Sequence, residues 1–124
     1  MPAPKRDPSK PYSREYRGAH RQRTVIKLPP GGCTDPVPPL PHGREWTDRE
    51  KERWETLWTS PQATQWDESC AGTVASLVVY ESMMLDGRAA AWSAQELRHC
   101  SAELGLTPAS MKSLSWEIGG TDDE

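Results

Sequence analysis

The side chains that most often perform catalysis are few in this sequence and lie far apart. The three histidines are His20, His42 and His99, and neither a nucleophile nor a pair of carboxylates is placed to work with any of them. His99 is followed by Cys100, but adjacent positions on a helix do not face each other. The sequence therefore predicts no catalytic residues, and we expect a protein that is not an enzyme.

The cysteines and glycines give no sign of a metal or cofactor site. Cys33, Cys70 and Cys100 are widely separated and form no C-x-x-C pair, which is the spacing that zinc and redox sites use. Cys70 and Cys100 fall on helical patterns, where cysteine is most often a small buried hydrophobe. Gly31-Gly32 lacks the strand, the helix and the Lys-Ser/Thr of a phosphate-binding loop. We therefore predict neither a metal nor a cofactor.

Basic side chains are concentrated at the start of the chain. Residues 1–27 carry eight Lys or Arg side chains and two acidic ones, a net charge of +6, whereas the rest of the chain carries −9. Such an arm can neutralise phosphates, and its Tyr12 and Tyr16 can stack on bases or sugars. Basic terminal segments also serve as solubilising tails or protein-docking arms. The residues predicted to bind DNA are Lys5, Arg6, Lys10, Arg14, Arg17, Arg21, Arg23 and Lys27.

Most of the prolines lie in residues 1–45 and exclude a long helix there. Each proline fixes its own φ and biases the residue before it away from the helical region. Residues 1–28 also have few apolar side chains to bury, so we predict a disordered, Pro-rich, basic arm. Residues 29–45 are predicted to form an extended spacer of polyproline character, interrupted by a glycine pair.

Residues 46–85 are predicted to form a helical hairpin. Thr47 and Glu50 have the spacing of a capping box, which opens a first helix that ends at residue 58. Ser60 and Pro61 then resemble an N-cap and a first helical residue, which open a long central helix that ends at residue 85. Apolar residues recur at helical spacing in both helices. The residues predicted to form the core or the subunit contacts are Trp54, Leu57, Trp58, Trp66, Val74, Leu77 and Val78.

Two short C-terminal helices are predicted to pack against the hairpin. The first opens with a capping box at Ser93 and ends at Gly105 in a Schellman motif. Thr107-Pro108 opens the second, and residues 119–124 form an acidic tail. No convincing alternating strand pattern is found. The predicted fold class is therefore all-α.

The helical domain, residues 46–118, is predicted to form a homo-oligomer. A body of this size buries a modest share of its surface and is marginally stable alone. The long central helix also has apolar residues on more than one side. A compact monomer whose central helix is fully wrapped is the alternative.

No run in the sequence approaches the ~20 apolar residues that span a membrane. Lys5 and Arg6 are followed by polar residues and not by the apolar stretch of a signal peptide. We therefore expect a cytoplasmic protein with no membrane partner.

Two segments of the helical domain have a distinctive composition. One is the elbow of the hairpin, and the other is the connection between the last two helices. Their key residues are Trp54, Leu57, Trp58, Ser60, Pro61 and Trp66 in the elbow, and Leu104, Gly105, Leu106, Thr107 and Pro108 in the connection. Together with the Pro-rich spacer, these segments resemble the small terminase subunits of tailed phages, particularly those of actinobacterial hosts.

This resemblance implies a ring-forming DNA-packaging protein with no catalytic motif. Such subunits recognise double-stranded phage DNA when packaging begins. They also bind and regulate the terminase large subunit, which carries the ATPase and the nuclease. The implied partners are therefore phage DNA, the large subunit and further copies of the same chain, and the implied location is the host cytoplasm.

Two other interpretations fit the residues. The chain can be a non-enzymatic helical adaptor or connector-like phage structural protein, with the arm as a peptide ligand. It can also be a transcription regulator, because the connection before Pro108 is as tight as a helix-turn-helix joint. The last helix offers only Lys112 as a cation, however, which argues against a recognition helix.

Overall fold

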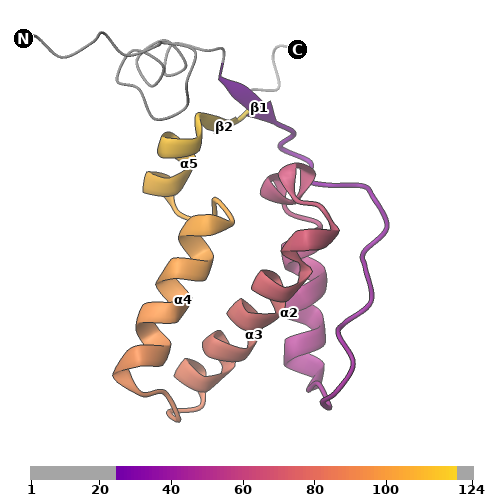
Figure 1. The fold of residues 1–124 in the computed structure, drawn as a ribbon. Helices are drawn as coiled ribbons and strands as arrows, with labels where there is room; N and C mark the ends of the chain where they lie inside the picture. The colour runs from indigo at the N-terminus through magenta and orange to yellow at the C-terminus, as the bar shows by residue number, and fades with distance from the viewer. Residues whose placement is uncertain (1–24, 120–124) are drawn as a thin grey trace, which may run out of the picture.

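The computed structural model describes residues 25–119 (Figure 1). The longest helix, α3, packs against α2 and against α4. The elements, in chain order, are β1 (Ile26–Leu28), α2 (Asp48–Trp58), the 3₁₀ helices η1 (Pro61–Gln65) and η2 (Glu68–Cys70), α3 (Ala71–Leu85), α4 (Ala91–Glu103), α5 (Pro108–Leu114) and β2 (Trp116–Ile118).

Helix α2 begins and ends where the sequence predicts. The Thr47 side chain accepts a hydrogen bond from the Glu50 backbone N–H at 3.1 Å, and the Glu50 carboxylate accepts one from the Thr47 N–H at 2.9 Å. This reciprocal pair is the predicted capping box. It satisfies two of the backbone donors that every helix leaves unpaired at its start.

The prediction of one long helix over residues 61–85 is wrong. Pro61 opens only the short helix η1, after which Trp66 and Asp67 are extended, with φ/ψ of −95°/152° and −128°/−171°. The Asp67 carboxylate accepts a hydrogen bond from the Ser69 N–H at 2.9 Å. Such a local bond gives the backbone an alternative to a continuous helix. Helix α3 therefore has only 15 residues.

Helix α4 begins three residues before the predicted start. Its N-cap is Ala90, and Ser93 is the third helical residue, whose hydroxyl oxygen accepts a hydrogen bond from the Ala90 N–H at 2.9 Å. Its end follows the prediction: Gly105 has a φ of 72°, and the N–H groups of Gly105 and Leu106 donate back into the last turn at 3.1 and 2.9 Å. These two bonds are those of a Schellman motif.

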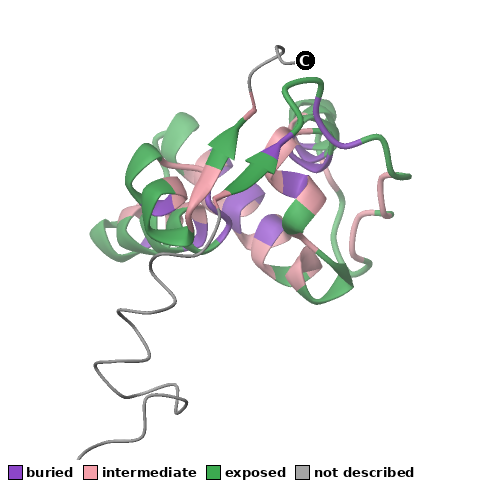
Figure 2. Cartoon of the chain, turned by 90° about the horizontal axis from the view of Figure 1, so that it is seen from above, coloured by how far each residue is buried: buried purple, intermediate pink, exposed green. Residues whose placement is uncertain are grey.

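A small parallel sheet corrects the all-α prediction to a mostly helical fold. Strands β1 and β2 pair in the register Ile26↔Trp116, Lys27↔Glu117 and Leu28↔Ile118, and they lie side by side in Figure 2. Residues 26–28 fall within the segment predicted to be disordered, yet Leu28 is completely buried. Strands of three residues are too short to give a readable alternation.

The core lies where α3 meets its neighbours. The buried apolar side chains of α2 and α3 are Trp54, Leu57, Trp58, Val74, Leu77 and Val78, all of which have the predicted helical spacing. Trp66 is half-buried, and its ring stands edge-on to that of Trp58 with 5.3 Å between the centroids. Burial of each large apolar side chain stabilises the fold by about 1.5–3 kcal/mol. These residues therefore hold the protomer together.

The Pro-rich spacer packs on α2. The indole N–H groups of Trp54 and Trp46 donate hydrogen bonds to the carbonyl oxygens of Pro38 and Pro41, at 2.8 and 3.1 Å. Near the start of the spacer, the N–H of Cys33 donates to the Thr59 carbonyl at 3.0 Å. The spacer is therefore a strap that covers part of the core.

No helix within residues 25–119 is both long and apolar enough to cross a membrane.

Candidate functional site

The predicted DNA-binding residues lie mostly outside the described part of the chain. Lys27 is described and lies on β1, where its Nζ is 2.8 Å from a carboxylate oxygen of Glu117 on β2. Both side chains are exposed, at 64% and 58%. The predicted DNA-binding residues outside the described range are Lys5, Arg6, Lys10, Arg14, Arg17, Arg21 and Arg23.

The root of the basic arm is fixed to the C-terminal strand. The N–H of Ile26 donates to the Ser115 carbonyl at 2.8 Å, and the N–H of Gly119 donates to the Leu28 carbonyl at 2.6 Å. Because the strands are parallel, residue 25 enters the sheet at the end where α5 gives way to β2. The arm therefore starts from an ordered ladder beside the last helix.

An open groove of about 690 Å³ lies beside this root, between α5 and β2. We call it the α5–β2 groove. Its lining is mostly apolar, and Lys112 and Glu117 supply the charges. No ion pair of Lys112 occurs within residues 25–119. The lining residues are Val25, Pro108, Met111, Lys112, Ser115, Trp116, Glu117 and Ile118.

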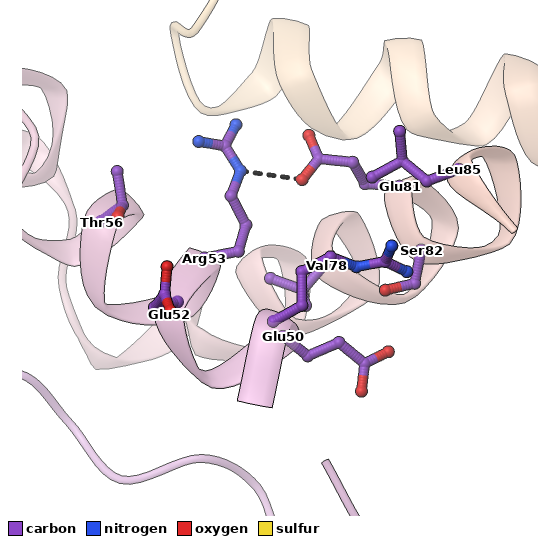
Figure 3. Close-up of a pocket in the computed structure, with 9 residues that line it drawn as sticks. Glu50, Glu52, Arg53, Thr56, Val78, Glu81, Ser82 and Leu85 are labelled. Atoms are coloured by element: carbon purple, nitrogen blue, oxygen red, sulfur yellow. Dashed lines mark hydrogen bonds and ion pairs between the residues drawn. The ribbon is translucent and has the colours of Figure 1, made fainter. Parts of the chain in front are cut away.

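A second, charged groove of about 220 Å³ lies between α2 and α3 (Figure 3). Arg53 donates to Glu81 at 2.8 Å, as the dashed line in Figure 3 marks, and Arg49 donates to Asp86 at 2.8 Å. Hydrogen bonds from Arg49 and Arg88 lower the pKa of Asp86. These pairs join the two helices across the groove. We therefore conclude that the charged side chains of this groove stabilise the contact between the two helices.

Glu50 is the buried carboxylate beside that groove, with 3% of the residue exposed. Burial acts to raise its pKa, but hydrogen bonds from Thr47 and Ser82, together with the Arg44 guanidinium, hold its pKa below the usual value. Arg44 is 3.3 Å from the carboxylate. A perturbed carboxylate in a cleft is a common mark of catalysis. Here the partners of Glu50 either cap helix α2 or pack against it, so Glu50 has a structural role.

The described histidines and cysteines lie in different environments. His42 and His99 are exposed, whereas Cys33 and Cys100 are buried. Burial also raises the pKa of the Cys100 thiol. In the part of the chain that the structure describes, no group of His, Cys, Asp and Glu side chains could hold a metal ion.

Sequence reasoning missed an exposed tryptophan at the turn between α3 and α4. Trp92 is 58% exposed, and its ring stands edge-on to that of Tyr80 with 5.9 Å between the centroids. Met84 and Leu85, at the end of α3, are 43% and 65% exposed. One feature of the sequence could have revealed it. Trp92 does not share the helical spacing of the apolar residues of α4 that face the core.

Comparison with known protein families identifies the chain. The family described as "Phage terminase small subunit" matches residues 2–123, which include both the basic arm and the helical body. Comparisons with curated proteins and with solved structures give no match. Small terminase subunits have a role in phage DNA packaging and are generally not catalytic. Because the match spans nearly the whole sequence, the chain belongs to the phage terminase small subunit family.

Proposed function

We propose that this small terminase subunit binds double-stranded phage DNA through its basic arm and acts as a ring of identical subunits. In this role it presents the DNA to the large subunit and regulates the ATPase and nuclease of that subunit during packaging into procapsids. Membership of the family supports the packaging role. The likeness to subunits from phages of actinobacterial hosts is part of the same proposal.

The proposal that the arm binds DNA is supported above all by the opposite net charges of the arm and the body. Residues 1–27 have a net charge of +6, and the rest of the chain has −9. An acidic body repels the phosphate backbone, so DNA is drawn to the arm. The ladder at Ile26 ties the arm to the body by backbone hydrogen bonds, which limits where bound DNA can lie.

Assembly would multiply a weak contact. One arm with a handful of cations binds DNA without sequence preference and loses affinity as salt rises. Several arms on one particle raise the effective concentration of each remaining arm once the first has bound. A ring of subunits therefore turns modest phosphate contacts into stable DNA binding.

DNA binding by the full chain and by a variant that lacks residues 1–24 tests this proposal. The deletion stops at residue 24 because Ile26–Leu28 belong to the fold. We expect the truncated protein to keep its oligomeric mass and to bind duplex DNA at least about tenfold more weakly. Its plot of log K against log salt should be less steep by about 0.9 for each phosphate that the arm no longer neutralises.

The matched control neutralises two exposed cations of the body, in the variants Lys51→Gln and Arg98→Gln. These changes should leave both the affinity and the salt slope almost unaltered. The arm is not the DNA-binding element if the truncated protein binds with the affinity and salt slope of the full chain.

The second candidate is a non-enzymatic helical adaptor or connector-like protein that docks protein partners. The apolar lining of the α5–β2 groove favours it, because such a surface suits a protein and not a phosphate backbone. In that case the full chain would not retard duplex DNA at low salt, with or without residues 1–24.

A further inference from the structure

Two unlike apolar surfaces lie at opposite ends of α4. One lies at the turn between α3 and α4, where Met84, Leu85 and Trp92 are exposed, and we call it the Trp92 surface. The other is the hollow α5–β2 groove. Figure 1 shows the turn at one end of the helices and the α5–β2 segment at the other. Within residues 25–119, no element of the protomer covers either surface fully.

The two surfaces are complementary in shape. The Trp92 indole is mostly exposed to solvent, and it makes an edge-on contact with the Tyr80 ring. A rigid aromatic side chain loses little conformational entropy when it is buried. The groove, at about 690 Å³, is in the size range that accommodates ligands much larger than an indole. Met111 and Trp116 in its lining offer the sulfur and aromatic contacts that suit a tryptophan.

The charges around the two surfaces are also complementary. Glu96 lies one turn after Trp92 on α4, so the two side chains share a face of that helix. Its carboxylate has only a 3.7 Å contact with His99 among the ion pairs of residues 25–119, and it is 48% exposed. Lys112 lines the groove and is exposed. A protomer thus carries an anion beside the exposed tryptophan and a cation in the lining of the groove, where the other charge, Glu117, is paired with Lys27.

We propose that Trp92 of one protomer inserts into the α5–β2 groove of the next, with Glu96 facing Lys112. The occupant of the groove is therefore a second copy of this chain. Because the two surfaces differ, each protomer uses one to bind the protomer ahead and the other to bind the protomer behind. Such a heterologous interface closes into a ring when the rotation between neighbours closes. This inference rests on the ring part of the proposed function.

A charge exchange tests the interface. Glu96→Lys and Lys112→Glu each place like charges opposite one another, and each should weaken assembly about tenfold or more. The double variant restores an opposite pair, with the signs exchanged, and should recover the mass of the unaltered protein. The measurement is the mass in solution at a fixed protomer concentration. Failure of the double variant to recover any assembly would overturn the assignment of this pair.

A mixing experiment tests the direction of the interface. Trp92→Ser removes the exposed side chain, and Met111→Glu places a charge in the groove, so neither variant alone should form a ring. Each variant keeps one working surface. An equal mixture should therefore give a heterodimer, whereas the unaltered protein forms the larger ring. A self-complementary interface would instead limit the unaltered protein to a dimer. Because Trp92 is exposed and Met111 lines an open groove, we expect both variants to fold. Far-UV circular dichroism and the unfolding transition check this.

The outcomes separate this inference from the proposed function. If rings still form with Trp92→Ser, with Met111→Glu and with both single charge changes, this interface is wrong. The proposal that the protein forms a ring would still stand. In that case, the groove would accept another occupant, such as a segment of the large subunit. A monomeric unaltered protein would overturn both the ring and this interface, whereas DNA binding by the arm is tested separately by its truncation.

Discussion

Trp66 and Leu104 are joined by a hydrogen bond in which the indole N–H donates to the backbone carbonyl at 3.0 Å. Trp66 belongs to the elbow after α2, and Leu104 is the C-cap of α4. A helix leaves its last carbonyl groups without partners inside the helix, and Trp66 supplies one. The two segments that carry the resemblance to small terminase subunits therefore form one structural unit.

Replacement of Trp66 by Phe keeps an aromatic ring but removes the donor. The Leu104 carbonyl would lose its partner in a buried region, so we expect the free energy of unfolding to fall by about 1–3 kcal/mol. Urea denaturation at a fixed protomer concentration measures the change. The neighbouring variant Gln65→Ala removes an exposed side chain and should have little effect. Equal stability of Trp66→Phe and the unaltered protein would show that the bond contributes nothing.

Gly105 is required for two reasons that a matched pair of variants separates. Its φ of 72° is in the left-handed region, and a Cβ there would collide with the ring of Trp116. Gly87 has a φ of 73°, but a Cβ at that position would meet nothing within 4 Å. Gly87→Ala should therefore cost about 1–2 kcal/mol from backbone strain alone.

Gly105→Ala should cost the same strain plus about 1–3 kcal/mol for the displaced Trp116 ring. It should also loosen β2, since Trp116 begins that strand. Thermal and urea unfolding of the two variants give the comparison. If both substitutions destabilise the protein equally, the contact between Gly105 and Trp116 is not tight in solution.

Glu50 makes stability depend on pH. Its pKa is lowered in the folded protein from the ordinary value of 4.5. The ionised carboxylate therefore contributes its full stabilisation above about pH 4.5 and loses it as the pH falls through the lowered folded pKa. Glu50→Gln should lower the free energy of unfolding by about 1–3 kcal/mol at pH 7. The difference from the unaltered protein should shrink below pH 4.5.

The control for this prediction is Glu52→Gln, which neutralises an exposed carboxylate on the same helix. Denaturant unfolding at a series of pH values between 3 and 7 is the measurement (about four pH units cover the transition). A stability difference for Glu50→Gln that stays constant across this range would contradict the account of its capping role.

Several helix ends could be predicted, because they depend on local side-chain chemistry. Thr47 with Glu50, and Thr107 with Pro108, begin helices as expected. Gly105 ends one as expected, since a positive φ favours glycine. The apolar spacing of α2 and α3 also identified the core. Each of these signals lies within a few residues of the feature it predicts.

Features that depend on distant contacts could not be predicted from the sequence. The pairing of β1 with β2 joins segments about 90 residues apart, and each strand is too short to show a period. The strap on α2 depends on Trp54 reaching the Pro38 carbonyl. The break before α3 did have a local signal, because the Asp67 carboxylate accepts a hydrogen bond from the Ser69 N–H. The apolar residues on either side of it nevertheless favoured a continuous helix. The α5–β2 groove arises only once the sheet has formed.

Several copies of the basic arm are proposed to act together on one DNA duplex. Native mass spectrometry of the full chain, with and without a short DNA duplex, measures this. We expect one defined oligomer that gains the mass of a single duplex, and that loses this gain when residues 1–24 are removed. A monomer in the absence of DNA, or one duplex bound to each protomer, would contradict it.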